Sequence, residues 1–422
     1  MYFWLSIAVF VLAYVAIMSE KLHRAIIALT GAALLIVLHV LSQEQAVDYI
    51  DFNTIGLLIG MMIIVTITKR SGVFEYLAVK SAQITRGRPL AILAALAVVT
   101  AVVSAFLDNV TTVLLIVPVT VALTDRLDVS PMPYLLLEII ASNIGGTATL
   151  IGDPPNIMIG SATGLGFLDF AANLAPVIVV VLLATIGVML LIYRKDLKTT
   201  DDRINSLLEL NPIDFIKDRV LLKKALIILA LTIVGFLLHQ TLKLESATIA
   251  LMGAALLMII SGEEPEETLL SVEWPTIFFF AGLFVIVGAM DVQGVIKILA
   301  QESLKITHGN LMQTGMLVLW LSAIASAFID NIPFVATMLP LLDTVGNLTH
   351  MPMESIWWAL SLGACLGGNG TLIGASANVI VAGMSERMGN PIRFMDYLKI
   401  GFPLMLMSIV ICTVYLFLRY WM

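Results

Sequence analysis

The chain has 422 residues, of which 59% are hydrophobic and 13% charged, and its formal net charge is −7. Soluble globular domains hold about 45–50% apolar and about 25% charged residues, so the composition excludes an ordinary soluble fold and predicts an all-α polytopic membrane protein. The sequence has no basic patch that would indicate binding to nucleic acid. The two cysteines, Cys365 and Cys412, lie in apolar segments and form neither a disulfide framework nor a metal-ligand spacing, so no metal or cofactor is expected.

Apolar runs of about 20 residues predict the membrane spans. In chain order these spans cover residues 2–18, 24–42, 53–69, 131–162 (broken), 172–193, 221–240, 246–262, 274–291, 352–384 (broken) and 397–421. The first run lacks a basic n-region and a small-residue cleavage site, so it is expected to be retained. Two more regions, 89–124 and 311–346, are apolar on both sides of a polar interruption, which favours re-entrant hairpins.

The chain repeats itself at a constant offset of 222 residues (326 − 104). Ser104–Asn109 matches Ser326–Asn331, and Thr149–Gly152 matches Thr371–Gly374, in one register without gaps. Such internal similarity indicates a duplicated chain. The expected division is a first-span segment (1–22), repeat one (23–193), a basic connector (194–220) and repeat two (221–422).

Lys and Arg residues cluster in the loop that holds Lys21 and Arg24, in the loop after residue 69 and in the connector 194–220. This distribution predicts that all three are cytoplasmic and that the N-terminus lies outside a plasma (inner) membrane. Loop 263–273 is expected on the cytoplasmic side as well, although it carries five glutamates, the last of which is Glu273, and no basic residue. Acidic residues contribute little to this rule. If region 89–124 enters and leaves on the same side, five full crossings separate the start of repeat one (residue 24) from the start of repeat two (residue 246). Because five is an odd number, the two repeats are expected to be inverted in the membrane.

Two glycine-rich polar stretches, Ser142–Asn156 and Gly367–Asn378, interrupt apolar segments at matching places. Lipid cannot satisfy freed backbone groups, so such stretches must be buried or line a watery cavity, and a matching pair points to a transporter site. The candidate substrate or ion ligands within them are Asn143, Gly145, Gly146, Thr147, Thr149, Asp153, Asn156, Asn369, Thr371, Ser376 and Asn378. The structural alternative is a glycine-rich kink needed only for tight packing.

Each predicted hairpin turns at an Asp-Asn pair, Asp108-Asn109 or Asp330-Asn331. A carboxylate at membrane depth marks an ion or substrate pathway by default, although Asp also caps helices well. Thr111 and Thr112 follow the first pair and offer hydroxyl groups, whereas the second pair is followed by an Ile-Pro sequence. The two tips are therefore not expected to bind the same species equally.

Three carboxylates are candidates for the group that couples transport to an ion gradient: Asp108, Asp153 and Asp330. Asp153 has no acidic counterpart, because Ala375 occupies the matching place; it is either a titrating group or a helix cap. Cys365 lies beside the second broken segment, where it serves either packing or ligation of a soft substrate.

The sequence contains no metalloprotease HExxH, no GxSxG, no P-loop and no ATPase domain. The protein is therefore not expected to be an enzyme, and the energy for transport must come from an ion gradient. An uncoupled channel through the same site stays open as an alternative.

The segment Ser104–Thr112 with the following Pro118, and the segment Gly145–Asn156, resemble the ArsB/NhaD branch of the ion transporter superfamily. The same segments are similar to those of the melanosomal P protein and, more distantly, of divalent-anion/sodium symporters. The resemblance implies a scaffold and an elevator-type transport domain with two hairpins and two broken helices. It also implies a substrate site between the hairpin tips. In the symporters the tips carry Ser-Asn-Thr, so the Asp residues here favour proton coupling.

The resemblance and the polar ring of Asn and Thr residues together predict an arsenite/antimonite efflux permease that exchanges As(OH)3 for protons. Neither motif block contains Arg or Lys, which argues against a multivalent anion. The alternatives are a sodium/proton antiporter and a carboxylate or inorganic anion transporter or channel. Expected partners are protons, the lipid bilayer, a second copy of the chain and, as in some relatives, a separate ATPase subunit.

Overall fold

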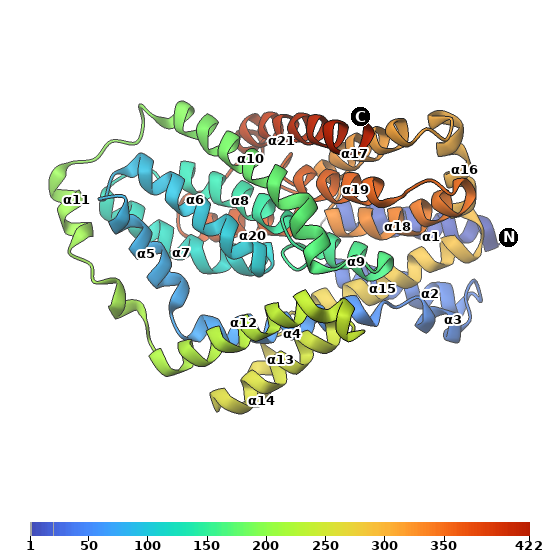
Figure 1. The fold of residues 1–422 in the computed structure, drawn as a ribbon, viewed down its shortest axis with the longest axis horizontal. Helices are drawn as coiled ribbons and strands as arrows, with labels where there is room; N and C mark the ends of the chain where they lie inside the picture. The colour runs from blue at the N-terminus through green and yellow to red at the C-terminus, as the bar shows by residue number, and fades with distance from the viewer. Residues whose placement is uncertain (1, 20) are drawn as a thin grey trace.

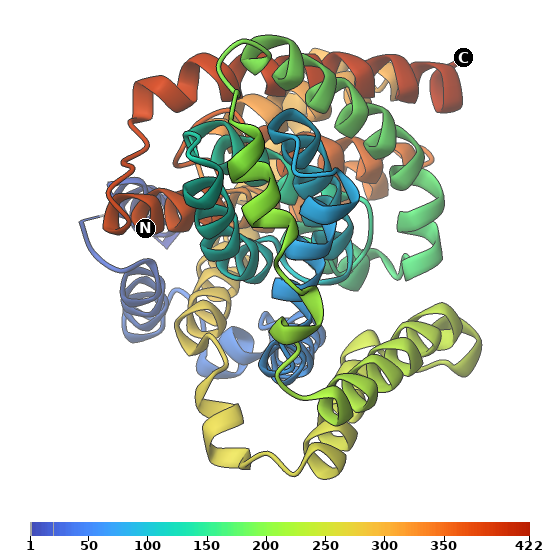
Figure 2. The ribbon, with the colours of Figure 1, turned by 90° about the vertical axis from the view of Figure 1, so that its left-hand side faces the viewer.

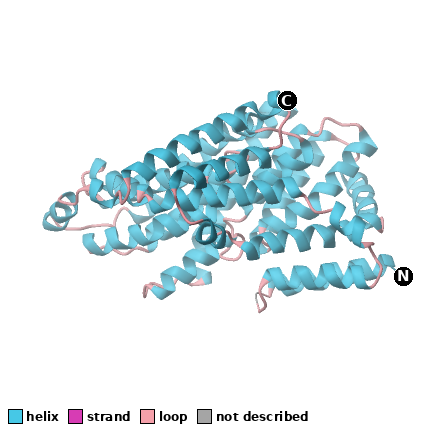
Figure 3. Cartoon of the chain, turned by 90° about the horizontal axis from the view of Figure 1, so that it is seen from below, coloured by secondary structure: helices cyan, strands magenta, loops and turns pink. Residues whose placement is uncertain are grey.

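The computed structural model describes residues 2–19 and 21–422; residues 1 and 20, both in the predicted first-span segment, lie outside the described residues. Across the described residues the secondary structure is helical and contains no strand, as the cartoon in Figure 3 shows. The predicted all-helical class is therefore confirmed.

The helices of the first half and of the connector run in chain order. They are α1 (Tyr2–Met18), α2 (Arg24–Val37), α3 (Gln43–Asp48), α4 (Phe52–Arg70), α5 (Val73–Ile84), α6 (Pro89–Phe106), α7 (Asn109–Leu127), α8 (Met132–Thr147), α9 (Pro154–Thr163), α10 (Phe167–Tyr193), α11 (Asp201–Leu208) and the short 3₁₀ helix η1 (Pro212–Phe215).

The second half repeats this order after the connector. Its helices are α12 (Arg219–Leu242), α13 (Ser246–Ser261), α14 (Pro265–Leu270), α15 (Trp274–Val292), α16 (Val295–Thr307), α17 (Leu311–Phe328), α18 (Asn331–Thr349), α19 (Glu354–Gly367), α20 (Ser376–Arg387), α21 (Phe394–Leu416) and the terminal π turn η2 (Phe417–Trp421).

Within the described residues, nine helical segments are long and apolar enough to cross a membrane. They are α4, α6, α7, α10, α12, α15, α17, α18 and the continuous segment Phe394–Trp421. Helices α1, α2 and α13 are apolar but shorter. The protein is thus a multi-pass membrane protein by length and composition, because about 20 apolar residues suffice to span the hydrocarbon core.

Two groups of helices lie on opposite sides of the molecule (Figures 1 and 2). One group contains α4, α12 and α13, which pack on one another, and the neighbouring pair α2 and α15. The other contains α6–α10 and α17–α21, with the connector helix α11 at its edge. We call the first group the lower layer and the second the upper layer.

Helices in matching places of the two halves make matching contacts. In the upper layer α6 packs on α8 as α17 packs on α19, and in the lower layer α2 packs on α15 and α4 on α13. The halves also cross over, because α7 contacts α20 and α18 contacts α9. Each helix that follows an Asp-Asn pair therefore packs against the second part of the broken helix in the opposite half.

Glycines allow the upper-layer helices to approach closely. A Cβ atom on Gly145 would collide with the backbone carbonyl of Ala101 in α6, and one on Gly367 would lie 2.6 Å from the carbonyl oxygen of Ala323 in α17. Small residues promote this kind of backbone-to-backbone packing between helices in membranes. Each broken helix is thereby fixed against the helix that leads to the Asp-Asn pair of its own half.

Candidate functional site

Helices α7 and α18 both begin at the Asp-Asn pairs. The Asp108 carboxylate accepts a hydrogen bond from the backbone N–H of Thr111 at 2.8 Å, and from the Thr111 hydroxyl. The Asp330 carboxylate accepts one from the backbone N–H of Ile332 at 3.1 Å. Both aspartates are thus N-caps, which satisfies donors that the first helical turn leaves unpaired. Capping uses only part of each carboxylate's capacity, so it does not exclude a second role.

The buried asparagines form one network that joins the two halves. The side-chain amide of Asn109 donates to Asn143 Oδ1 at 2.9 Å. Asn143 Nδ2 in turn donates to Asn369 Oδ1 at 2.9 Å and to Asn378 Oδ1 at 3.0 Å. All four residues are buried. Their side chains satisfy one another, so the central part of the predicted polar ring has little hydrogen-bonding capacity left for a solute.

Further amides hold the broken segments themselves. Asn156 Nδ2 donates to the carbonyl of Thr149, and Asn378 Nδ2 donates to the carbonyl of Thr371, each at 2.9 Å. The two bonds lie 222 residues apart and stabilise the same non-helical backbone in each half. Cys365 occupies the place that matches Asn143, and its thiol points to Asn156 Oδ1 at 3.6 Å. The cysteine therefore serves as the weaker counterpart of an amide donor.

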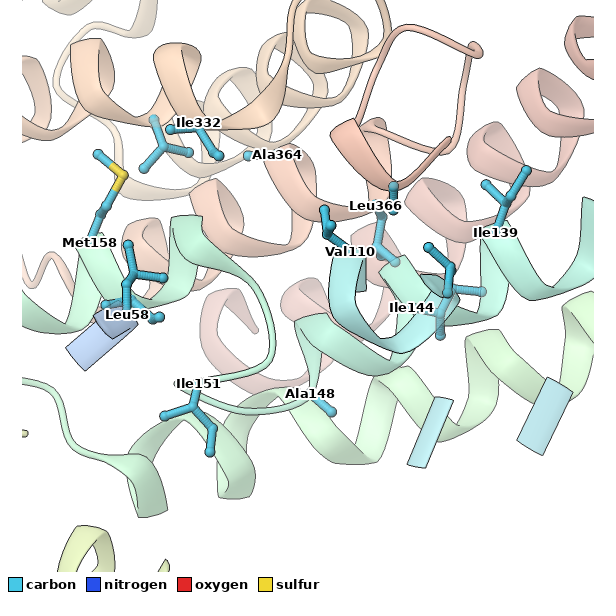
Figure 4. Close-up of a cluster of buried hydrophobic side chains, with 14 of the residues drawn as sticks. Leu58, Val110, Ile139, Ile144, Ala148, Ile151, Met158, Ile332, Ala364 and Leu366 are labelled. Carbon is cyan, nitrogen blue, oxygen red and sulfur yellow. The ribbon is translucent and has the colours of Figure 1, made fainter. Parts of the chain in front are cut away.

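A cavity of about 30 Å³ lies where the two halves meet, and we call it the ion pocket. That volume holds little more than one water-sized species. Its polar lining consists of Arg24, Asp108, Asn109, Asp153, Glu273, Thr276, Asn331 and Ser376. Apolar side chains complete the wall, among them Leu58 of α4, Val110 of α7 and Ile332 of α18, which Figure 4 draws in the surrounding cluster.

Three carboxylates face the ion pocket, from Asp108, Asp153 and Glu273. Asp153 is 1% exposed, and both of its oxygens accept from Asn331 Nδ2 at 3.3 Å. Negative groups confined this closely repel one another, and a proton or a bound cation relieves the repulsion. Among the described residues, however, no three His, Cys, Asp or Glu side chains are arranged to hold a metal ion. A cation here would therefore be coordinated by mixed ligands rather than by a carboxylate cage.

Arg24 brings a positive charge to the same place. Its Nη1 donates to Asp330 Oδ2 at 3.0 Å and to Ser376 Oγ at 2.5 Å. The guanidinium carbon also lies 5.0 Å from the centre of the Phe279 ring, within the range of a cation–π contact. Arg24 starts α2 and Phe279 belongs to α15, whereas Asp330 and Ser376 start α18 and α20. The arginine thus ties the lower layer to the upper layer.

The structure gathers only some of the residues that the sequence singled out. Asp108, Asn109, Asp153, Asn331 and Ser376 line the ion pocket, and Asp330 lies beside it on Arg24. The others do not line the pocket. Apart from Thr111, which donates to Asp108, they are buried in the helices and broken segments of the upper layer: Thr112, Asn143, Gly145, Gly146, Thr147, Thr149, Asn156, Asn369, Thr371 and Asn378.

Sequence reasoning missed three of the polar residues that line the pocket: Arg24, Glu273 and Thr276. It assigned Arg24 to a cytoplasmic loop and Glu273 to an acidic loop. One signal was available for both. Each flanks an apolar span at its N-terminal end, where a charged side chain can turn back into the protein.

Comparison with known proteins supports a transport role. Residues 14–363 match the CitMHS family, described as citrate transporters. A protein of Mycobacterium bovis named as an uncharacterized transporter is 44% identical, over 98% of each chain. A 46 kDa membrane protein of Mycobacterium leprae is 41% identical, over 99% of this chain and 98% of its own. The human P protein is 36% identical, over 95% of this chain and 58% of its own. The resemblance to the P protein is thereby confirmed, while the ArsB/NhaD branch stays a prediction.

Two solved transporters share the fold at low sequence identity. The YdaH transporter of Alcanivorax borkumensis superposes with a TM-score of 0.59 at 14% identity, over 93% of this chain and 95% of that one. MtrF of Neisseria gonorrhoeae, described with a class of antimetabolite efflux pumps, gives a TM-score of 0.63 at 14% identity, over 99% and 95%. With its helical membrane architecture and its match over residues 14–363, the chain belongs to the CitMHS family of transporters and is a secondary transporter homologous to the P protein.

Proposed function

We propose that this transporter exchanges sodium ions for protons, and that both bind at the ion pocket. The observation that carries the proposal is the convergence of Asp108, Asp153 and Glu273 on a cavity of about 30 Å³. Carboxylates buried at membrane depth are the usual groups of proton relays and coupled ion sites. Broken helices supply the additional backbone ligands that sodium requires.

The size and charge of the pocket favour an inorganic cation over a large anion. The family description names citrate, which carries three carboxylates of its own. Among the residues that line the pocket, Arg24 is the one Lys or Arg side chain, against three acids. Binding a tricarboxylate there would add like charges to a site that is already negative.

Arsenite or antimonite efflux in exchange for protons is the second candidate, and one observation favours it. The Cys365 thiol is buried within 3.6 Å of Asn156 in the broken segment that carries Asp153, and sulfur is a ligand that soft elements prefer. It ranks second because the amides once expected to surround As(OH)3 bond to one another.

Purified protein in liposomes containing a trapped pH indicator tests these candidates directly. With an acidic interior, external sodium should drive protons out and make the interior more alkaline. Potassium, arsenite and citrate are added in parallel. Asp153→Asn should abolish the sodium response, whereas Asp343→Asn, which removes an exposed carboxylate on α18, should preserve it. A pH change with arsenite or citrate but none with sodium would overturn the proposal.

A further inference from the structure

A second cavity shares the Arg24 side chain with the ion pocket. It has a volume of about 330 Å³ and lies between the end of α1, the start of α2 and the starts of α18 and α20. We call it the vestibule; its walls include Ile17, His23, Phe328, Asp330 and Ile380. Two side chains, Arg24 and Ser376, line both the vestibule and the ion pocket. These two residues therefore form the partition between the cavities.

The partition is closed by the hydrogen bonds of one guanidinium group. Arg24 Nη1 bridges Asp330 and Ser376, at 3.0 and 2.5 Å. The side chains of Arg24 and Asp330 are 25% and 14% exposed, so solvent screens this ion pair less than one at the surface. An ion entering from the vestibule meets Asp330 first, and that carboxylate already holds a positive charge.

The duplication makes this bridge unique to one half. The place that matches Arg24 holds Ser246, and the place that matches Ser376 holds Pro154. The helix start at Asp108 therefore lacks both members of the bridge. If Asp330 were only a helix cap, it would need no partner that Asp108 lacks. Arg24 therefore has a role other than supporting the cap.

We infer that Arg24 is a tethered cation that occupies Asp330 until a transported cation displaces it, and that the path from the vestibule to the ion pocket opens only then. The Arg24 guanidinium and the transported cation compete for the Asp330 carboxylate, because each positive charge weakens the attraction of the carboxylate for the other. The identity of the transported cation rests on the proposed function. The partition itself does not, because it follows from the two cavities and the bridge between them.

Thiol labelling tests the partition without measuring transport. Ile332→Cys places a thiol in the ion pocket, and Ile380→Cys places one in the vestibule. The native Cys365 and Cys412 are buried, so the unmodified chain serves as the blank. With Ag⁺, a thiol-reactive cation small enough for a cavity of about 30 Å³, Arg24→Gln should speed labelling of the Ile332→Cys thiol roughly tenfold if the bridge is closed nine-tenths of the time. The thiols that remain free are counted with a maleimide after denaturation. Labelling of the Ile380→Cys thiol should not change.

Two further variants make the result decisive. Asp330→Asn removes the other partner of the bridge and should speed labelling of the Ile332→Cys thiol to the same extent, which covers the case in which Arg24→Gln fails to fold. Arg70→Gln, which breaks the ion pair with Glu263 far along α4, is the matched control and should leave labelling unchanged. Unchanged labelling in both folded bridge variants would overturn the inference.

Sodium kinetics then separate this inference from the proposed function. If both are right, Arg24→Gln should lower the KM for sodium roughly tenfold, because the ion no longer has to displace the guanidinium. Faster labelling in a protein that does not transport sodium would refute the proposed substrate and keep the partition. Sodium transport with an unchanged KM and unchanged labelling would refute the partition and keep the substrate.

Discussion

The side-chain amide of Asn331 donates to both carboxylate oxygens of Asp153, at 3.3 Å to each. Asn331 opens α18 in the second half, and Asp153 precedes α9 in the first. The acid that has no counterpart in the repeat is therefore held by the repeated Asn of the opposite half. A buried carboxylate without donors is costly, so this contact fixes where the charge of Asp153 can lie.

Replacing Asn331 with leucine should leave Asp153 without this donor. An unsatisfied buried acceptor costs about 1–3 kcal/mol, and we expect exchange in liposomes to fall roughly tenfold as the carboxylate moves to another partner. Asn347→Leu, on the same helix but with an exposed partner, is the control. Equal exchange rates in the two variants would show that the function of Asp153 does not depend on its hydrogen bonds from Asn331.

Asp108→Asn should separate the charge of Asp108 from its capping role. Asparagine caps helices as well as aspartate does, so the hydrogen bond to the Thr111 N–H at the start of α7 should survive and the melting temperature should stay the same. We expect proton-coupled transport to fall about tenfold or more, because the negative charge facing the ion pocket is gone. Full activity in a stable variant would assign Asp108 to capping alone.

The centre of the asparagine network should be important for stability. Asn143 makes three side-chain bonds, to Asn109, Asn369 and Asn378. Hydrogen bonds between membrane helices average about 0.6 kcal/mol, so Asn143→Ala should cost about 2 kcal/mol of unfolding free energy in detergent. Asn205→Ala, at an exposed position of α11 in the connector, should cost almost nothing. A double-mutant cycle with Asn378→Ala measures the coupling energy between the Asn143 and Asn378 side chains, which join the two halves. A coupling energy of zero would contradict the network.

Glycine packing in the upper layer gives a sharper stability test. In Gly145→Ala, the new methyl group would collide with the backbone carbonyl of Ala101, which cannot rotate away. Overpacking of this kind costs about 1–3 kcal/mol, so we expect a lower melting temperature and a lower yield. Gly187→Ala in α10 meets nothing within 4 Å and should be neutral or slightly stabilising. Similar melting temperatures for the two variants would show that α6 and α8 can separate at little cost.

The helical class followed from the sequence because it depends on local composition. Apolar runs specify helices in lipid whatever they pack against. The Asp-Asn pairs and the glycine-rich polar stretches likewise predict breaks. Helices α7 and α18 begin at the pairs, and α9 and α20 begin within the stretches. The inverted arrangement of the repeats and the elevator motion stay predictions, because the helix contacts alone do not fix a direction across the membrane.

The composition of the pocket did not follow from the sequence, because it depends on contacts between distant residues. Arg24 and Asp330 are 306 residues apart. The local pattern at the start of α2 indicates only that a charged residue flanks the apolar span, and not which distant side chain it contacts. Arg24 lies outside both motif blocks, so the number of Lys and Arg residues within those blocks understates the positive charge near the pocket. The role of the asparagines as ligands stays a prediction. The sequence also did not indicate that Asn143 bonds to Asn369 and Asn378, because these contacts join distant residues too.

The two charged residues of the ion pocket that have no charged counterpart in the other half, Asp153 and Arg24, both come from the first half. Asp153 matches Ala375, and Arg24 matches Ser246. Two copies of the second half could repeat the helices and the caps, yet they would enclose a site with neither the unmatched acid nor the arginine. The ancestral symmetry therefore survives in the helices, the caps and the amides that hold the broken segments, but not in these two charges. The gene can no longer be rebuilt from one half without losing the chemistry of its centre.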